Sequence, residues 1–133
     1  MSDESKRTWE KIDALVEARF RGENTWKMRL EISKALGRFK EECPPKGKTV
    51  EEATLDRLYK SRDLFAWYRK KAKRTLRNEK PEGDERKRLE AYIWAMHFLH
   101  QAVVYRIEKI TGVFDEREKR KIQRKKEKAQ NER

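Results

Sequence analysis

LEAYIWAMHFLHQAVVYRIEKI, from Leu89 to Ile110, carries apolar side chains at the spacing of an α-helix on two opposite sides. The broader side consists of Leu89, Tyr92, Ile93, Met96, Leu99, Val103, Val104, Ile107 and Ile110. The narrower side consists of Trp94, Phe98, Ala102 and Tyr105. A helix that is apolar on two sides needs two partners, so this stretch predicts the central helix of a bundle.

The second apolar side of this helix could be covered in two ways. Helices of the same chain could cover both sides, as is usual in small bundles. Alternatively, Trp94, Phe98 and Tyr105 could form an interface with another protein or with a second copy of the chain. The sequence leaves both explanations open.

The rest of the chain also has helical periodicity, with signals that end or begin each helix. A first helix is expected over about 5–21 and ends at Gly22, and a second runs over 25–42 until two prolines stop it. Thr49 and Glu52 form a capping-box pattern for a third helix over 49–77, which is either continuous or broken near Ser61. The turn NEKPEGD over 78–84 precedes the fourth helix, with Asp84 as its expected N-cap.

No stretch alternates with period two for long enough to predict a sheet. We therefore expect an all-α fold, a compact bundle of four to five helices with a basic C-terminal extension that is helical or disordered. The expected domains are a helical bundle over 1–114 and a highly charged basic tail over 115–133.

Composition narrows the class of protein. The chain has 133 residues, of which 45% are charged, and a net charge of +12. Its N-terminus lacks the apolar run of a secretory signal, no run approaches a membrane span, and Cys43 is its single cysteine. A cytoplasmic protein without a membrane partner is expected, and the abundance of Lys, Arg and Glu is typical of thermophile proteins.

Most of the excess positive charge lies in two segments. Residues 60–80 carry nine cations and two acids, and the tail over 115–133 carries nine cations and five acids. Segregation of this kind favours a polyanionic partner, since charges that serve only solubility would do as well interspersed. Within the first segment, WYRKKAKRTLR over 67–77 places cations along one side of the third helix.

The candidate nucleic-acid-binding residues come from these two segments. In the third helix they are Arg62, Trp67, Arg69, Lys70, Lys73, Arg74 and Arg77, with the indole able to stack on a base. In the tail they are Lys121, Arg124, Lys125 and Lys128, which would contact phosphates without sequence preference. A solvated or cross-paired helix face, and a tail that only solubilises, are the alternatives.

Signs of catalysis are weak. His97 and His100 are three residues apart, but no acid or thiol lies where it would complete a metal site, so core histidines are expected. The sequence has no Walker loop and no GxGxxG pattern, and Cys43 has no nearby base. A protein with no enzymatic activity, metal or cofactor is the expectation.

Two functions remain. The first is non-enzymatic binding of the phosphate backbone of RNA or DNA, single- or double-stranded, as a small subunit of a ribonucleoprotein complex. In size, helicity and charge the chain resembles the small helical subunits of CRISPR effector complexes, which implies copies stacked along a nucleic acid. The second is an assembly or adaptor subunit that docks partners through its two-sided fourth helix, with the charge serving solubility.

Overall fold

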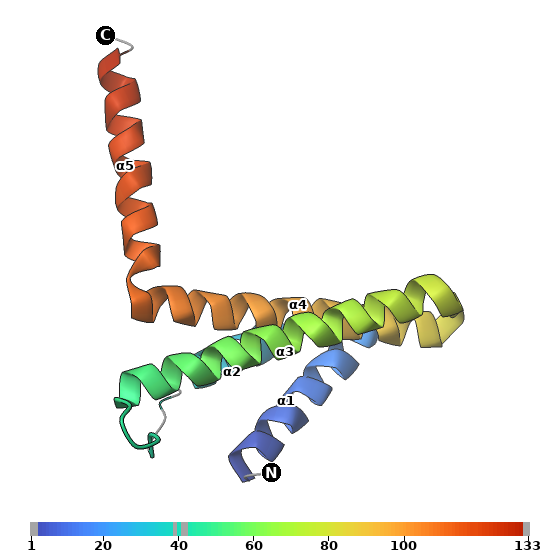
Figure 1. Ribbon diagram of the computed structural model, residues 1–133. Helices are drawn as coiled ribbons and strands as arrows, with labels where there is room; N and C mark the ends of the chain where they lie inside the picture. Colours follow the sequence, from blue (N-terminus) through green and yellow to red (C-terminus); the bar gives the residue numbers. More distant parts are fainter. Residues whose placement is uncertain (1–2, 39, 41–42, 132–133) are drawn as a thin grey trace.

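The structure, a computed structural model, describes residues 3–38, 40 and 43–131 and consists of five α-helices (Figure 1). They are α1 (Asp3–Phe20), α2 (Trp26–Arg38), α3 (Val50–Glu79), α4 (Gly83–Thr111) and α5 (Val113–Asn131). No strand occurs in the residues described, and the predicted all-α bundle is confirmed.

The two longest helices, α3 and α4, form an antiparallel hairpin that spans the length of the molecule (Figure 1). In the described residues α4 contacts each of the other helices: α3 along its length, α1 and α2 on another side, and α5 at its end. The prediction that the fourth helix is the centre of the bundle is therefore confirmed, and its own chain supplies partners on both sides.

The core is built largely from α4. Its buried members are Ile12 and Leu15 of α1, Ile32 of α2, Leu58 and Phe65 of α3, and Ala95, Met96, Leu99, Val103 and Ile107 of α4. Burying a side chain such as Leu99 or Val103 stabilises the fold by about 1.5–3 kcal/mol each. Ala91 of α4 is also buried.

Gly22 ends α1 as predicted. Its φ of 74° lies in the left-handed region that favours glycine. The backbone N–H of Gly22 donates to the carbonyl of Arg19 at 3.1 Å, and that of Glu23 donates to the carbonyl of Ala18 at 3.0 Å. These two bonds form a Schellman motif, which satisfies carbonyls that the last turn of the helix would otherwise leave free.

Thr49 caps α3, also as predicted. Its side-chain oxygen accepts a hydrogen bond from the backbone N–H of Glu52 at 3.1 Å. A cap of this kind stabilises a helix by about 1 kcal/mol. The helix continues through Ser61 without a break, which resolves one open question of the sequence.

Two predicted helix ends are wrong. The second helix was expected to reach residue 42, but α2 ends at Arg38. The turn between α3 and α4 is shorter than expected, with Lys80 in a left-handed conformation at φ 46°. As a result α4 begins at Gly83, so Asp84 lies in its first turn and the N-cap is Glu82, without a side-chain capping bond.

The basic extension is helical rather than disordered. Gly112, at φ 78°, ends α4, and α5 begins at the next residue and turns away from the hairpin (Figure 1). All residues over 119–131 are exposed, including Ile122, which is 53% exposed. This part of α5 is therefore a solvated helix with no apolar cover.

Candidate nucleic-acid interface

Four cations form an exposed face on the C-terminal half of α3. Lys70, Lys73, Arg74 and Arg77, which we call the α3 cationic face, are spaced so that they lie on one side of the helix, and all four side chains are exposed. Within the described residues none of the four makes an ion pair or a side-chain hydrogen bond. Their charges are therefore available to a polyanion in solvent.

The ion pairs of the molecule lie elsewhere. In the described part of the chain, Arg88 Nη1 lies 2.8 Å from Glu17 Oε2, and Arg21 Nε lies 3.3 Å from Glu17 Oε1. These pairs connect α1 to the start of α4 and to its own C-terminus. The cross-paired alternative for the α3 cationic face finds no support in these contacts, while a solvated face remains the alternative to a binding surface.

Arg62 and Arg69 do not share the exposure of the α3 cationic face. Both are half-buried, so the exposed stripe is narrower than predicted. The reason is helical geometry: Arg69 follows the core residue Phe65 by four positions and therefore lies only about 40° from it around the helix. Arg62 Nε is 3.0 Å from Asp63 Oδ1, and its guanidinium lies 4.9 Å from the centre of the Tyr59 ring.

Trp67 lies at the edge of the α3 cationic face and is 54% exposed. Its ring centre is 5.3 Å from that of Tyr68, and the ammonium of Lys71 lies 5.0 Å from the indole centre. Lys71 is itself exposed and was not among the predicted site residues. Its position four residues after Trp67, one helical turn away, is the signal that would have identified it.

The predicted tail residues share one face of α5. Lys121, Arg124, Lys125 and Lys128, the α5 cationic face, are spaced at i, i+3, i+4 and i+7 and are all exposed. However, α5 begins at the end of α4, whereas the α3 cationic face lies at the other end of the hairpin (Figure 1). The structure therefore does not bring the two sets of cations together.

The two histidines of α4 are not the satisfied core residues that the sequence predicted. His97 is exposed. His100 is half-buried, and its Nδ1 is buried without a hydrogen-bond partner. Burial lowers the pKa of His100, and the positive charges of His97, Arg69 and Arg62 lower it further, whereas Asp63 acts in the opposite direction.

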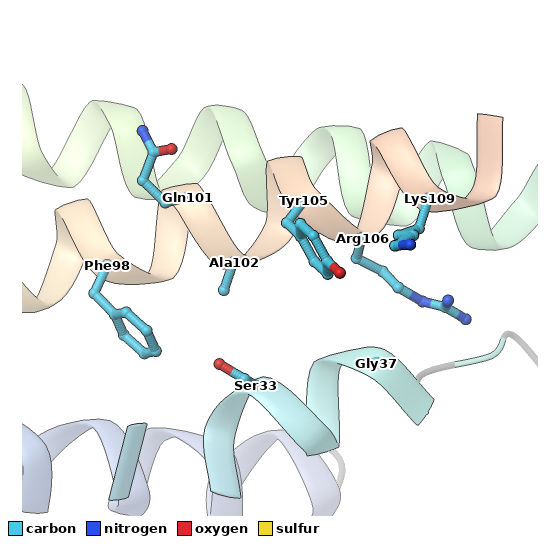
Figure 2. Close-up of a pocket in the computed structure, with 8 residues that line it drawn as sticks. All are labelled: Ser33, Gly37, Phe98, Gln101, Ala102, Tyr105, Arg106 and Lys109. Carbon is cyan, nitrogen blue, oxygen red and sulfur yellow. The ribbon is translucent and has the colours of Figure 1, made fainter. Parts of the chain in front are cut away.

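A shallow groove lies between α2 and α4, on another side of the molecule (Figure 2). It has a volume of about 380 Å³ and is lined by Ser33, Gly37, Phe98, Gln101, Ala102, Tyr105, Arg106 and Lys109. Figure 2 shows the Phe98 and Tyr105 side chains of α4 facing this space, with the hydroxyl of Ser33 opposite.

Trp94 is only partly accessible to solvent. It is half-buried, and the guanidinium groups of Arg19 and Arg29 lie 4.7 Å and 5.8 Å from its ring centre. Its ring stacks on that of Phe98 at 6.5 Å. Of the three aromatic residues considered for a protein interface, Tyr105 is the most open, at 51% exposure.

The described residues form neither a metal-binding cluster nor a membrane-spanning helix. Across residues 3–38, 40 and 43–131, no group of three His, Cys, Asp or Glu side chains is arranged to hold a metal ion. None of the helices described is long and apolar enough to cross a bilayer.

No known protein family, curated protein or solved structure matches this chain. The proposals below rest on its own residues.

Proposed function

We propose that this protein is a non-enzymatic nucleic-acid-binding subunit that contacts the phosphate backbone largely without sequence specificity. The observation that carries the proposal is the α3 cationic face, four exposed cations on one side of a helix without an ion pair in the described residues. Like charges at this spacing repel one another, so the face is unfavourable unless an anion binds to it. A polyanion neutralises the whole row at once.

The neighbouring residues support the same reading. Trp67 offers an exposed indole beside the cations, which suits stacking on an unpaired base. The fourth helix, α4, presents few polar side chains suited to reading base edges, so recognition through phosphates is expected. A cytoplasmic ribonucleoprotein complex that contains this chain as a small subunit is part of the proposal.

The test is a fluorescence-anisotropy titration with labelled single-stranded RNA, single-stranded DNA and duplex DNA over a range of salt concentrations. The variant replaces Lys70, Lys73, Arg74 and Arg77 by Ala. We expect its logarithmic salt slope to fall by about 3, since each phosphate contact contributes about 0.7 for single strands and 0.9 for duplex DNA.

A matched control removes four exposed lysines from α1 and α2, namely Lys6, Lys11, Lys27 and Lys34. It loses the same charge, so general electrostatic attraction falls equally in both variants. The proposal requires that the control keep nearly the salt slope of the parent. Equal losses in both variants would mean that net charge, and not the α3 cationic face, attracts the nucleic acid.

The groove between α2 and α4 favours a second candidate function, docking of another protein. Arg106 and Lys109 lie at one end of the groove, and no acid among the described residues lines it, so an amphipathic helix with acidic residues is the partner it suits. A second copy is disfavoured because each chain carries a net charge of +12. Negligible binding of all three nucleic acids at low salt would favour this candidate over the first.

A further inference from the structure

Helix α5 stands apart from the rest of the molecule. In the described part of the chain it contacts α4 and no other helix, and Figure 1 shows it projecting from the end of the hairpin. Every residue over 119–131 is exposed. At 1.5 Å per residue this segment is a helix about 20 Å long, and solvent reaches it from all sides.

The cations of this segment lie on more than one side of the helix. They are Lys119, Arg120, Lys121, Arg124, Lys125, Lys126 and Lys128. Since each residue turns the helix by about 100°, Lys119 and Lys126 form one cationic flank, and Lys121, Lys125 and Lys128 form another. A helix that lies along a single phosphate strand needs cations on one side only. Two flanks suit a position between two rows of phosphates.

A narrow apolar strip separates the two flanks. Ile122 and Ala129 are seven residues apart and therefore lie within about 20° of each other around the helix, with Lys125 and Lys126 about 50° to either side of them. The opposite side of the helix carries Arg120, Arg124 and Glu127. Glu127, the single acid over 119–131, accepts a hydrogen bond at 3.3 Å from Gln123 of the same helix. The segment thus has an apolar front, two cationic flanks and its acid behind.

The major groove of B-form DNA has the matching shape and chemistry. It is about 12 Å wide and admits an α-helix, whose diameter with side chains is about 10–12 Å. Phosphates line both of its edges, and the methyl groups of thymine on its floor accept apolar contacts. The major groove of A-form RNA is too deep and narrow for side chains to read. Neighbouring helices cover α3 and α4, whereas over 119–131 α5 is free to enter a groove.

We propose that α5 lies lengthwise in the major groove of duplex DNA. Ile122 and Ala129 face the bases, and the two cationic flanks contact phosphates of opposite strands. This inference rests on the proposed function, and it names the nucleic acid and the groove that α5 takes. Because the charged contacts go to phosphates, binding stays largely independent of sequence.

A matched pair of variants of the full-length protein tests which side of α5 faces the DNA. Ile122→Glu places a carboxylate on the apolar front, and Gln123→Glu places one about 100° further around the helix. Both positions are exposed and both variants lose one unit of net charge, so folding and general attraction change equally. We expect Ile122→Glu to reduce affinity for duplex DNA several-fold more than Gln123→Glu does, in anisotropy titrations at one salt concentration. Equal losses would contradict the proposed orientation.

A second experiment blocks the groove itself. The probe is a duplex whose cytosines carry a glucosyl group on a C5 hydroxymethyl, which fills the major groove and leaves the phosphates unchanged. We expect the parent to bind this duplex several-fold more weakly than the unmodified one. Replacing Lys121, Arg124, Lys125 and Lys128 by Ala should remove the difference between the two duplexes. Equal affinity of the parent for both would overturn the groove position.

The outcomes separate this inference from the proposed function. If duplex DNA binds through the α3 cationic face but the glucosyl groups have no effect, α5 lies outside the groove and the proposed function stands. Binding of single strands without binding of duplex DNA also overturns the groove position alone. If RNA, single-stranded DNA and duplex DNA all fail to bind at low salt, both proposals are wrong.

Discussion

His100 is a titratable residue on which both burial and the neighbouring positive charges act. Its imidazole is half-buried against α3 and surrounded by Arg62, Arg69 and His97. The folded protein therefore binds a proton there less readily than the unfolded chain does. This single side chain couples the stability of the fold to pH even when no ligand is present.

We predict that stability falls with acidification through His100. Its pKa is lower in the folded state than the ordinary value of about 6.5, so the unfolded chain binds more protons in the window between the two values. The free energy of unfolding should therefore decrease as pH falls through this window and change no further, through His100, below it.

Urea denaturation of the parent and of His100→Gln at a series of pH values measures this effect. The variant has no proton to take up at this position, so its decrease should be smaller than that of the parent. His97→Gln serves as the comparison: it keeps the His100 imidazole and its burial, the largest cause of the lowered pKa, so it should retain most of the parent's decrease. An identical pH profile for the parent and His100→Gln would show that the imidazole titrates alike in both states.

Helix α3 combines buried core residues, a contact surface with α4 and the α3 cationic face in one helix of 30 residues. The helix is anchored at its start by the Thr49 cap and along its length by Leu58, Phe65 and Ala72, which are buried. Because α3 is continuous, the α3 cationic face keeps a fixed position relative to the contact between α3 and α4. A break in the middle of the helix would remove this fixed relation.

Ser61→Pro tests this continuity. Proline removes one backbone hydrogen bond and clashes with the preceding turn, so we predict a loss of about 3 kcal/mol or more in the free energy of unfolding. Ser61→Ala, which keeps the helix, should change it by less than about 1 kcal/mol. Urea unfolding followed by circular dichroism gives both values, and similar stability for the two variants would mean that α3 tolerates a break there.

Much of this architecture could be predicted from local sequence signals. Gly22 and Thr49 marked helix ends because their backbone or side-chain chemistry acts within a few residues. Periodicity identified the core side of α4. Asp84 was misassigned because several residues in NEKPEGD suit a turn, and the backbone alone decides which of them caps the helix.

The candidate site was less predictable, for a physical reason. The angular position of Arg69 places it among the cations, but its burial depends on where α4 packs, which is a property of the tertiary structure. The same holds for His100, whose unpaired nitrogen becomes evident only when α3 is in place. Lys71 could have been found, since it lies one turn from Trp67.

At the scale of the whole molecule, the α3 and α5 cationic faces lie near opposite ends of the hairpin (Figure 1). Much of α4 separates them, and its 29 residues make a helix of about 44 Å at 1.5 Å per residue. One nucleic acid can contact both faces only if it is long enough to span this separation. Under the proposed function, the two faces are thus two separate contact surfaces joined by α4.

We predict that affinity for duplex DNA rises with duplex length and then levels off at roughly 10–15 base pairs, since each base pair adds about 3.4 Å. Shorter duplexes reach one face only. Replacing Lys121, Arg124, Lys125 and Lys128 by Ala should move this plateau to shorter lengths, and anisotropy titrations with a series of duplexes measure it. A plateau at the same length in the parent and this variant would show that α5 contributes no contact.

The position of α5 also affects how the size of this protein is measured. A compact chain of this length has a radius of gyration of about 14 Å. Here a long helical hairpin carries a second helix that projects from one end (Figure 1), so the chain sweeps out a larger volume than a sphere of the same mass. A single copy will leave a gel-filtration column ahead of globular standards of its mass, and such early elution is not evidence of a dimer.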